Sequence, residues 1–161
     1  MFRFYKAFFV SMLAIGLFSS PVHADFSRSA TIGLAITGAF GVVLHAVSAA
    51  ASFKSKYEIS PIEGEPRRAT QESATATHGL AAFFTLTAAA SLACTPLAIV
   101  PLAGFGMMFA GMGIGSTALS FHKDSDRSDH DWHITSLATG VGGAVASIGL
   151  FLGSYVSNLP N

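Results

Sequence analysis

Uncharged apolar runs alternate with short charged segments along this chain. The longest run extends from His78 to Phe121 and contains no lysine, arginine, aspartate or glutamate. A membrane helix needs about 20 apolar residues, so this run is long enough for two spans. Pro96 and Pro101 lie near its middle, and proline interrupts a helix because it lacks an amide donor. The run therefore predicts a hairpin of two membrane helices. The predicted spans are about 78–98 and 101–121.

Two further apolar segments flank this hairpin, at about 30–53 and 134–156, and each is long enough to cross a bilayer. The polar segments 54–77 and 122–133 separate the spans and are predicted to be loops, the first with a short surface helix near its end. The predicted fold is an all-α membrane protein, a four-transmembrane-helix bundle in contact with the lipid bilayer.

The N-terminal residues predict a secretory signal peptide. A basic start at Arg3 and Lys6 precedes the apolar run 7–18, and small residues before Asp25 suit a signal peptidase. We expect cleavage after Ala24, which leaves residues 25–161 as the four-span membrane domain. The alternative is an uncut anchor, which leads to the same topology downstream.

Basic residues indicate how the spans are oriented. Because four spans place both predicted loops on one side, the loops should share a compartment. Among the basic residues after the signal peptide, only Arg28 falls on the opposite side. The positive-inside rule then predicts cytoplasmic loops and periplasmic mature termini in a bacterial inner membrane. The basic loop residues are Lys54, Lys56, Arg67, Arg68, Lys123 and Arg127.

Composition narrows the classes of function. Charged residues make up 11% of the chain, well below the roughly 25% of ordinary soluble proteins. The formal net charge is zero, so nothing in it favours a nucleic-acid partner. Cys94 is the single cysteine, which excludes an intrachain disulfide or a multi-cysteine metal site.

Small and polar residues recur every three or four positions along each span. This spacing places them on one helix face, and membrane helices pack through such faces. Two Gly-x-x-x-Gly pairs, Gly111/Gly115 and Gly149/Gly153, match the close-packing pattern. A tight bundle is expected, with a homo-oligomer or a membrane-complex partner as an open alternative. The predicted faces are Thr37, Gly41, His45, Ser48 and Ser52; His78, Ala82, Thr85 and Ala89; Gly104, Met108, Gly111, Gly115, Ala118 and His122; and His133, Ser136, Gly140, Gly143 and Ser147.

Histidines are the strongest candidates for chemistry. His45 is the one histidine away from the boundary of a predicted span, and an imidazole at such depth needs a partner. Histidine and carboxylate ligands together suit divalent transition metals, and two histidines on facing helices could hold a b-type haem. The candidate cofactor ligands are His45, His78, His122 and His133. The candidate metal ligands are His45, His122, Asp124, Asp126, Asp129, His130, Asp131 and His133.

Three functions follow as hypotheses. The first is a non-enzymatic structural or accessory subunit that packs through glycine-rich faces. The second is a metal- or haem-binding membrane protein. The third is a small channel or transporter that uses Thr37, His45, Ser48 and Ser52 as its path. Catalysis is not expected, because no acidic residue lies near His45 and Ser48 on that helix.

Overall fold

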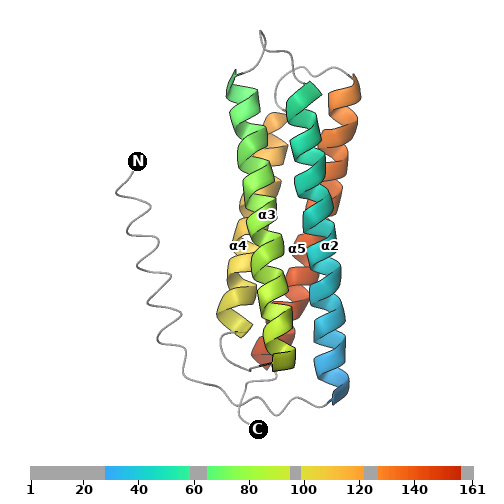
Figure 1. The fold of residues 1–161 in the computed structure, drawn as a ribbon, viewed down its shortest axis with the longest axis vertical. Helices are drawn as coiled ribbons and strands as arrows, with labels where there is room; N and C mark the ends of the chain where they lie inside the picture. The colour runs from blue at the N-terminus through green and yellow to red at the C-terminus, as the bar shows by residue number, and fades with distance from the viewer. Residues whose placement is uncertain (1–27, 59–64, 95–98, 122–126, 157–161) are drawn as a thin grey trace, which may run out of the picture.

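The computed structural model describes residues 28–58, 65–94, 99–121 and 127–156, which form four helices. The helices run alternately up and down (Figure 1), so the bundle has a Glu58 end, where α2 stops and α3 starts, and an Arg28 end. The predicted signal peptide, 1–24, lies outside the described residues. The helices are α2 (Arg28–Glu58), α3 (Glu65–Cys94), α4 (Ile99–Ser120) and α5 (Arg127–Val156).

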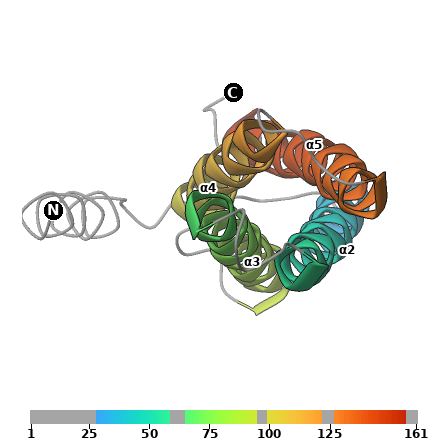
Figure 2. The same ribbon diagram turned by 90° about the horizontal axis from the view of Figure 1, so that it is seen from above.

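The four helices stand at the corners of a square. Seen along the bundle, each helix lies beside its neighbours in sequence, and α5 returns to pack against α2 (Figure 2). Contacts between the diagonal helices α3 and α5 are sparse by comparison with those along the sides. This arrangement leaves one shared interior that all four helices line.

The helices extend beyond the predicted membrane spans. α2 continues to Glu58, and the segment 65–77, predicted as part of a loop, forms the N-terminal part of α3. Alanine, glutamate, arginine and glutamine in this segment favour helix, and Pro66 is tolerated because it lies in the first turn. At 1.5 Å per residue α2 is about 46 Å long, which exceeds the roughly 30 Å of a hydrocarbon core. An upright helix of this length would extend beyond the hydrocarbon of a bilayer.

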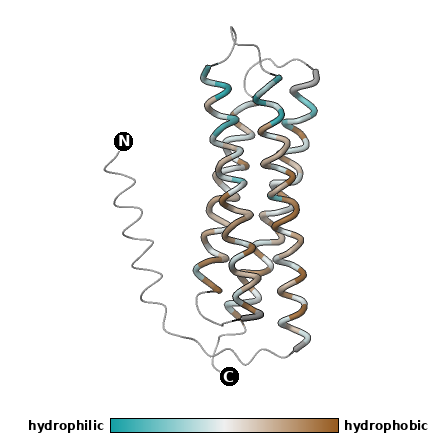
Figure 3. Tube along the Cα trace, in the orientation of Figure 1, coloured by the Kyte–Doolittle hydropathy of each residue, from teal (hydrophilic) through white to brown (hydrophobic). Residues whose placement is uncertain are grey.

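Three helices are long and apolar enough to cross a membrane: Ser29–Glu58, Ile99–Ser120 and His130–Val156. α3 does not join them among the described helices, because its first turns carry charged residues and its apolar part is rich in threonine. Hydrophilic residues gather at the Glu58 end, and the rest of the bundle is mainly apolar (Figure 3). The predicted all-helical bundle is thus confirmed, with three of its four described helices able to span a membrane.

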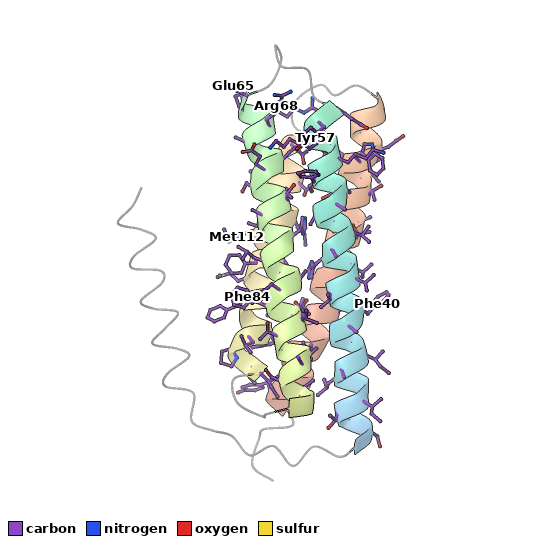
Figure 4. All side chains as sticks on the ribbon, in the orientation of Figure 1. Phe40, Tyr57, Glu65, Arg68, Phe84 and Met112 are labelled. Atoms are coloured by element: carbon purple, nitrogen blue, oxygen red, sulfur yellow. The ribbon has the colours of Figure 1, made fainter. Side chains whose placement is uncertain are left out.

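The distribution of side chains is inverted relative to a soluble protein. Ile36, Phe40 and Val145 are 65%, 60% and 63% exposed, whereas Leu150 is the only large apolar side chain among the described residues that is fully buried. Phe40 and Met112 project from the outer surface, and Glu65 and Arg68 lie at the Glu58 end (Figure 4). Exposed apolar surface of this extent is typical of an interaction surface for lipid or for another protein.

The predicted packing face is correct for α2 and α5 and wrong for α4. In α4, Gly111 and Gly115 are exposed, and an added Cβ at either would meet nothing within 4 Å. Glycine and alanine occupy every side of this helix, so small size does not mark its interior, whereas the polar Thr117 and Ser120 do. The buried residues of α4 are Ile99, Ala103, Gly106, Ala110, Gly113, Thr117 and Ser120.

The second Gly-x-x-x-Gly pair does lie at a helix interface. A Cβ at Gly149 would stand 3.1 Å from the Cγ2 of Thr37, and one at Gly153 would overlap the side chain of Leu34. Both contacts join α5 to α2. Their backbones approach closely here because these glycines have no side chains, as expected for packing between membrane helices.

Candidate functional site: a buried histidine and hydroxyl column

The interior of the bundle contains a line of buried polar side chains, which we call the polar column. All four helices contribute to it, and every member has 2% exposure or less. The column extends from the Glu58 end to the middle of the bundle. Its members are His45, Ser48, Ser52, Ser55, Gln71, His78, Thr85, Thr117, Ser120, His133, Ser136 and Ser147.

His45 lies at the inner end of the column. Its Nε2 is 3.1 Å from the hydroxyl oxygen of Ser147, which is also 3.2 Å from Thr85 Oγ1. The Ser147 hydroxyl donates its hydrogen to the Gly143 carbonyl at 2.9 Å. Since a hydroxyl has one hydrogen, Ser147 accepts from the histidine. His45 is therefore assigned the tautomer with its proton on Nε2 and a lone pair on Nδ1.

His78 has the same arrangement on the neighbouring helix. Its Nε2 is 3.4 Å from Thr117 Oγ1, and the Thr117 hydroxyl donates to the Gly113 carbonyl at 2.9 Å. This assigns a proton to Nε2 and a lone pair to Nδ1 of His78 as well. Thr117 lies 3.2 Å from the hydroxyl of Ser136, which is 2.6 Å from that of Ser52. Hydroxyls thus extend the column toward the Glu58 end.

The two histidine rings join these two hydrogen-bonded groups. Their centroids are 6.2 Å apart and their planes are inclined by 28°. His45 belongs to α2 and His78 to α3, so the pair lies across the interface of these helices. From Lys54, near the Glu58 end, to His45 is nine residues, or about 13 Å along the helix. The pair is therefore well inside the bundle.

Glycine backbones pack directly against the imidazole rings of His45 and His78. A Cβ at Gly143 would lie 2.7 Å from the Cε1 and Nδ1 of His45, and a Cβ at Gly113 would lie 2.7 Å from the Nδ1 of His78. Gly140 also contacts the His78 ring, where a Cβ would come within 2.6 Å of Cε1. Real Cβ atoms do not approach other atoms so closely. The glycines of α4 and α5 are thus required for the imidazoles to fit inside the bundle.

His133 and Gln71 form the outer level of the column. The Gln71 amide donates to the Ser120 hydroxyl at 2.8 Å and contacts the Nε2 of His133 closely. Because the Ser120 hydroxyl donates to the Thr117 carbonyl, it accepts from Gln71. The second amide hydrogen then faces Nε2 of His133, which must carry a lone pair. His133 is thus assigned the tautomer opposite to that of His45 and His78.

Three buried atoms of the column have no hydrogen-bond partner among the described residues. They are Nδ1 of His45, Nδ1 of His78 and Oε1 of Gln71. With the tautomers assigned above, all three are acceptors. A buried polar atom without a partner costs roughly 1–3 kcal/mol. The column therefore has acceptors in excess, which a hydrogen-bond donor would satisfy.

The column is closed toward the Arg28 end by an apolar layer, which consists of Ala88, Ala103 and Leu150. Leu34 and Phe151 pack against this layer. Of the fully buried polar side chains that the structure describes, only Ser154 lies beyond it, where it donates to the Leu150 carbonyl. The buried polar side chains thus lie almost entirely between this apolar layer and the Glu58 end.

Charged and aromatic residues surround the Glu58 end. Lys56 Nζ forms an ion pair with Glu72 at 2.6 Å, and Lys54 Nζ lies 4.0 Å from the centre of the Trp132 ring. Since Trp and Lys favour the membrane–water interface, this level fits the boundary of the hydrocarbon. The Lys56 pair is partly exposed, so we assign it little stabilisation.

The histidine and aspartate loop does not form a site in the described part of the chain. His122, Asp124 and Asp126 lie outside the described residues, and Asp129 is in the first turn of α5 without a described side chain. His130 and Asp131 are exposed. His133 is buried, in ring contact with Phe121 at 4.9 Å. Of the described residues, no three histidine, cysteine or acidic side chains are grouped to hold a metal ion.

The described histidines do not fit a bis-histidine haem. Nε2 of His45 and Nε2 of His78 each face a hydroxyl, and Gly113, Gly140 and Gly143 contact the rings directly. A macrocycle requires a flat gap with one ring nitrogen aimed at the iron from each side. The packed glycines leave no such gap between these helices.

The sequence predicts the buried histidines but not Gln71 and Thr117, which also belong to the polar column. Gln71 was placed in a predicted loop, and Thr117 fell outside the predicted face of α4. A signal for Gln71 exists in the sequence: Gln71, His78 and Thr85 are spaced by seven residues and share one helix face. All three are fully buried.

No family model, curated protein or solved structure matches this chain. The class of protein therefore rests on the fold and the site. Apolar helices with outward-facing apolar side chains, around a small and polar interior, fit a membrane protein built as a helical bundle.

Proposed function

We propose that all four helices cross the membrane, including α3. It packs along α2 and α4 over their lengths, so a bilayer around those helices also surrounds α3. Its outward residues Leu80, Phe83 and Leu86 are 42%, 60% and 54% exposed and apolar. Its threonines Thr77 and Thr87 donate to their own helix backbone, which satisfies them in lipid. With a cleaved signal peptide, the Glu58 end then faces the cytoplasm of a bacterial cell.

Cysteine labelling tests this topology, because Cys94 is the single native cysteine and ends α3. In intact cells, a membrane-impermeant maleimide should label Cys94 from the periplasmic side. A Glu65→Cys variant in a Cys94→Ser background should be labelled only after the cells are opened. Labelling of both positions from the same side would contradict a membrane-spanning α3.

We further propose that the protein is a small channel or transporter that carries cations through the polar column. The observation that supports this class is the excess of buried acceptors at His45, His78 and Gln71. A bundle interior that only holds helices together gains nothing from unpartnered nitrogens at that depth. Ionisable residues inside membrane proteins commonly mark ion pathways, and lone pairs attract positive charge.

Cation flux in proteoliposomes tests this function. The purified protein is reconstituted, a membrane potential is imposed, and entry of H⁺, Na⁺ and K⁺ is followed with separate internal dyes. We expect flux of one cation that falls at least tenfold in His45→Ala and in His78→Ala. His130→Ala is the matched control, since His130 is exposed and outside the column. The absence of any protein-dependent flux, or equal flux in all variants, would overturn the proposal.

The structural or accessory role is the second candidate. Bonds between hydroxyls join α2 to α5, with Ser48 at 2.7 Å from Thr139 and Ser52 at 2.6 Å from Ser136. Such bonds hold membrane helices together without any transported ligand. Catalysis is not part of either proposal, because the Ser48 hydroxyl contacts Thr139 and a backbone carbonyl rather than a base. A folded protein that carries no cation would favour this candidate.

A further inference from the structure

We propose that His45 and His78 together form a binding site for one proton. This inference rests on the proposed function, since it names the cation that the column carries. The site consists of two neutral imidazoles on adjacent helices, with ring centroids 6.2 Å apart and an unpartnered, buried Nδ1 on each.

The donor set favours a proton over a metal ion. A divalent transition metal needs three or four protein ligands, commonly including thiolate or carboxylate. The groups that contact the two rings are hydroxyls and the backbones of glycines. Among the described residues, no third histidine, cysteine or acidic side chain is grouped with the pair. A proton requires a single lone pair, which each ring offers at Nδ1.

The pair should hold one proton and resist a second. By Coulomb's law at an effective dielectric constant of about 20, two charges 6.2 Å apart repel enough to weaken the second binding by about a hundredfold. Binding of one proton leaves the other imidazole neutral and able to exchange with it.

No described carboxylate lies beside the pair to neutralise the bound proton. The facing groups are Thr117 and Gly113 from α4, and Ser147 and Gly143 from α5. The other buried histidine that the structure describes, His133, is bonded to Gln71 at the outer level, where the Arg67 charge also acts on it. The charged residues Lys56 and Glu72 pair with each other near the Glu58 end. The bound proton is therefore stabilised by lone pairs, hydroxyl dipoles and, at His45, the backbone carbonyl of Gly143.

Nitrogen NMR of ¹⁵N-histidine-labelled, full-length protein in lipid nanodiscs tests this site over a pH series. Imidazole nitrogens report directly whether each carries a proton. At high pH we expect both rings to show a protonated Nε2 and a bare Nδ1. On acidification the pair should take up one proton, and a second only after the proton concentration rises about a hundredfold further. His45→Asn and His78→Asn assign the signals.

The chain holds six histidines, so His122→Gln, His130→Gln and His133→Gln identify the signals of the others while both rings of the pair stay in place. The stoichiometry is then read with the pair intact, and the test remains valid if His45→Asn or His78→Asn fails to fold. Two rings that titrate independently at the same pH, or two rings that stay neutral while the folded protein carries Na⁺ or K⁺, would overturn the inference. In the second outcome the proposed transport function would stand. A shared proton without any cation flux would support the site and remove the transport function.

Discussion

Replacing Gly143 with valine should prevent the bundle from closing around His45. A Cβ at this position would lie 2.7 Å from two atoms of the imidazole, and that ring is buried on all sides. Neither partner can move freely, because the ring is bonded to Ser147 on the same helix as the glycine. Overpacking a core costs roughly 1–3 kcal/mol and occasionally more, and we expect about 3 kcal/mol of folding free energy to be lost here.

Gly111→Val is the matched control, because a side chain there meets nothing within 4 Å. Thermal unfolding of both variants in the same detergent, followed by circular dichroism, measures the difference. The control should unfold at the wild-type temperature, and the Gly143 variant should unfold far lower or not fold. Equal stability of the two variants would show that the contact between Gly143 and His45 is absent in the membrane protein.

Leu150→Ala should both destabilise the bundle and open the polar column toward the Arg28 end. Leu150 is fully buried between Ala88 and Ala103, so truncation leaves a cavity that these small residues cannot fill. Such substitutions cost about 2–5 kcal/mol in soluble proteins. Since lipid removes the contribution of water exclusion, we expect about 2 kcal/mol. The cavity should also raise passive cation leak in proteoliposomes severalfold.

Leu152→Ala serves as the comparison on the same helix, because Leu152 is 52% exposed toward lipid. It should change neither the unfolding temperature nor the leak. A Leu150→Ala protein with raised leak that disappears in the double variant with His45→Ala would place the leak in the column. Unchanged leak in a folded Leu150→Ala protein would show that this layer does not limit ion passage.

The fold was largely predictable because lipid contact imposes a simple rule on sequence. Long uncharged runs predict four spans, and three of the described helices are long and apolar enough to cross a membrane. Helix ends were less predictable. The polar start of α3 looks like a loop by hydropathy, although its residues favour helix and tertiary packing extends it. The topology and the signal peptide stay predictions.

The site was predictable in part. His45, Ser48 and Ser52 on α2, and Ser136, Gly140 and Gly143 on α5, were placed correctly on buried faces by their spacing. The buried face of α4 was not predicted correctly, because glycines and alanines occur on every side of this helix. Only the polar residues Thr117 and Ser120 mark its interior side. The sequence could not predict which histidine nitrogens lack hydrogen-bond partners. This depends on which acceptor each neighbouring hydroxyl donates to, and that is set by the three-dimensional packing.

While the protein is being inserted, the buried polar side chains of α2 lack their hydrogen-bond partners, because these partners are synthesised later. The polar face of α2 finds its hydrogen-bond partners on α5, through Ser52 with Ser136 and His45 with Ser147. Of the four described helices α5 is synthesised last, so α2 enters the bilayer before its partner exists. Until then His45 must be shielded by α3, by water or by the insertion machinery.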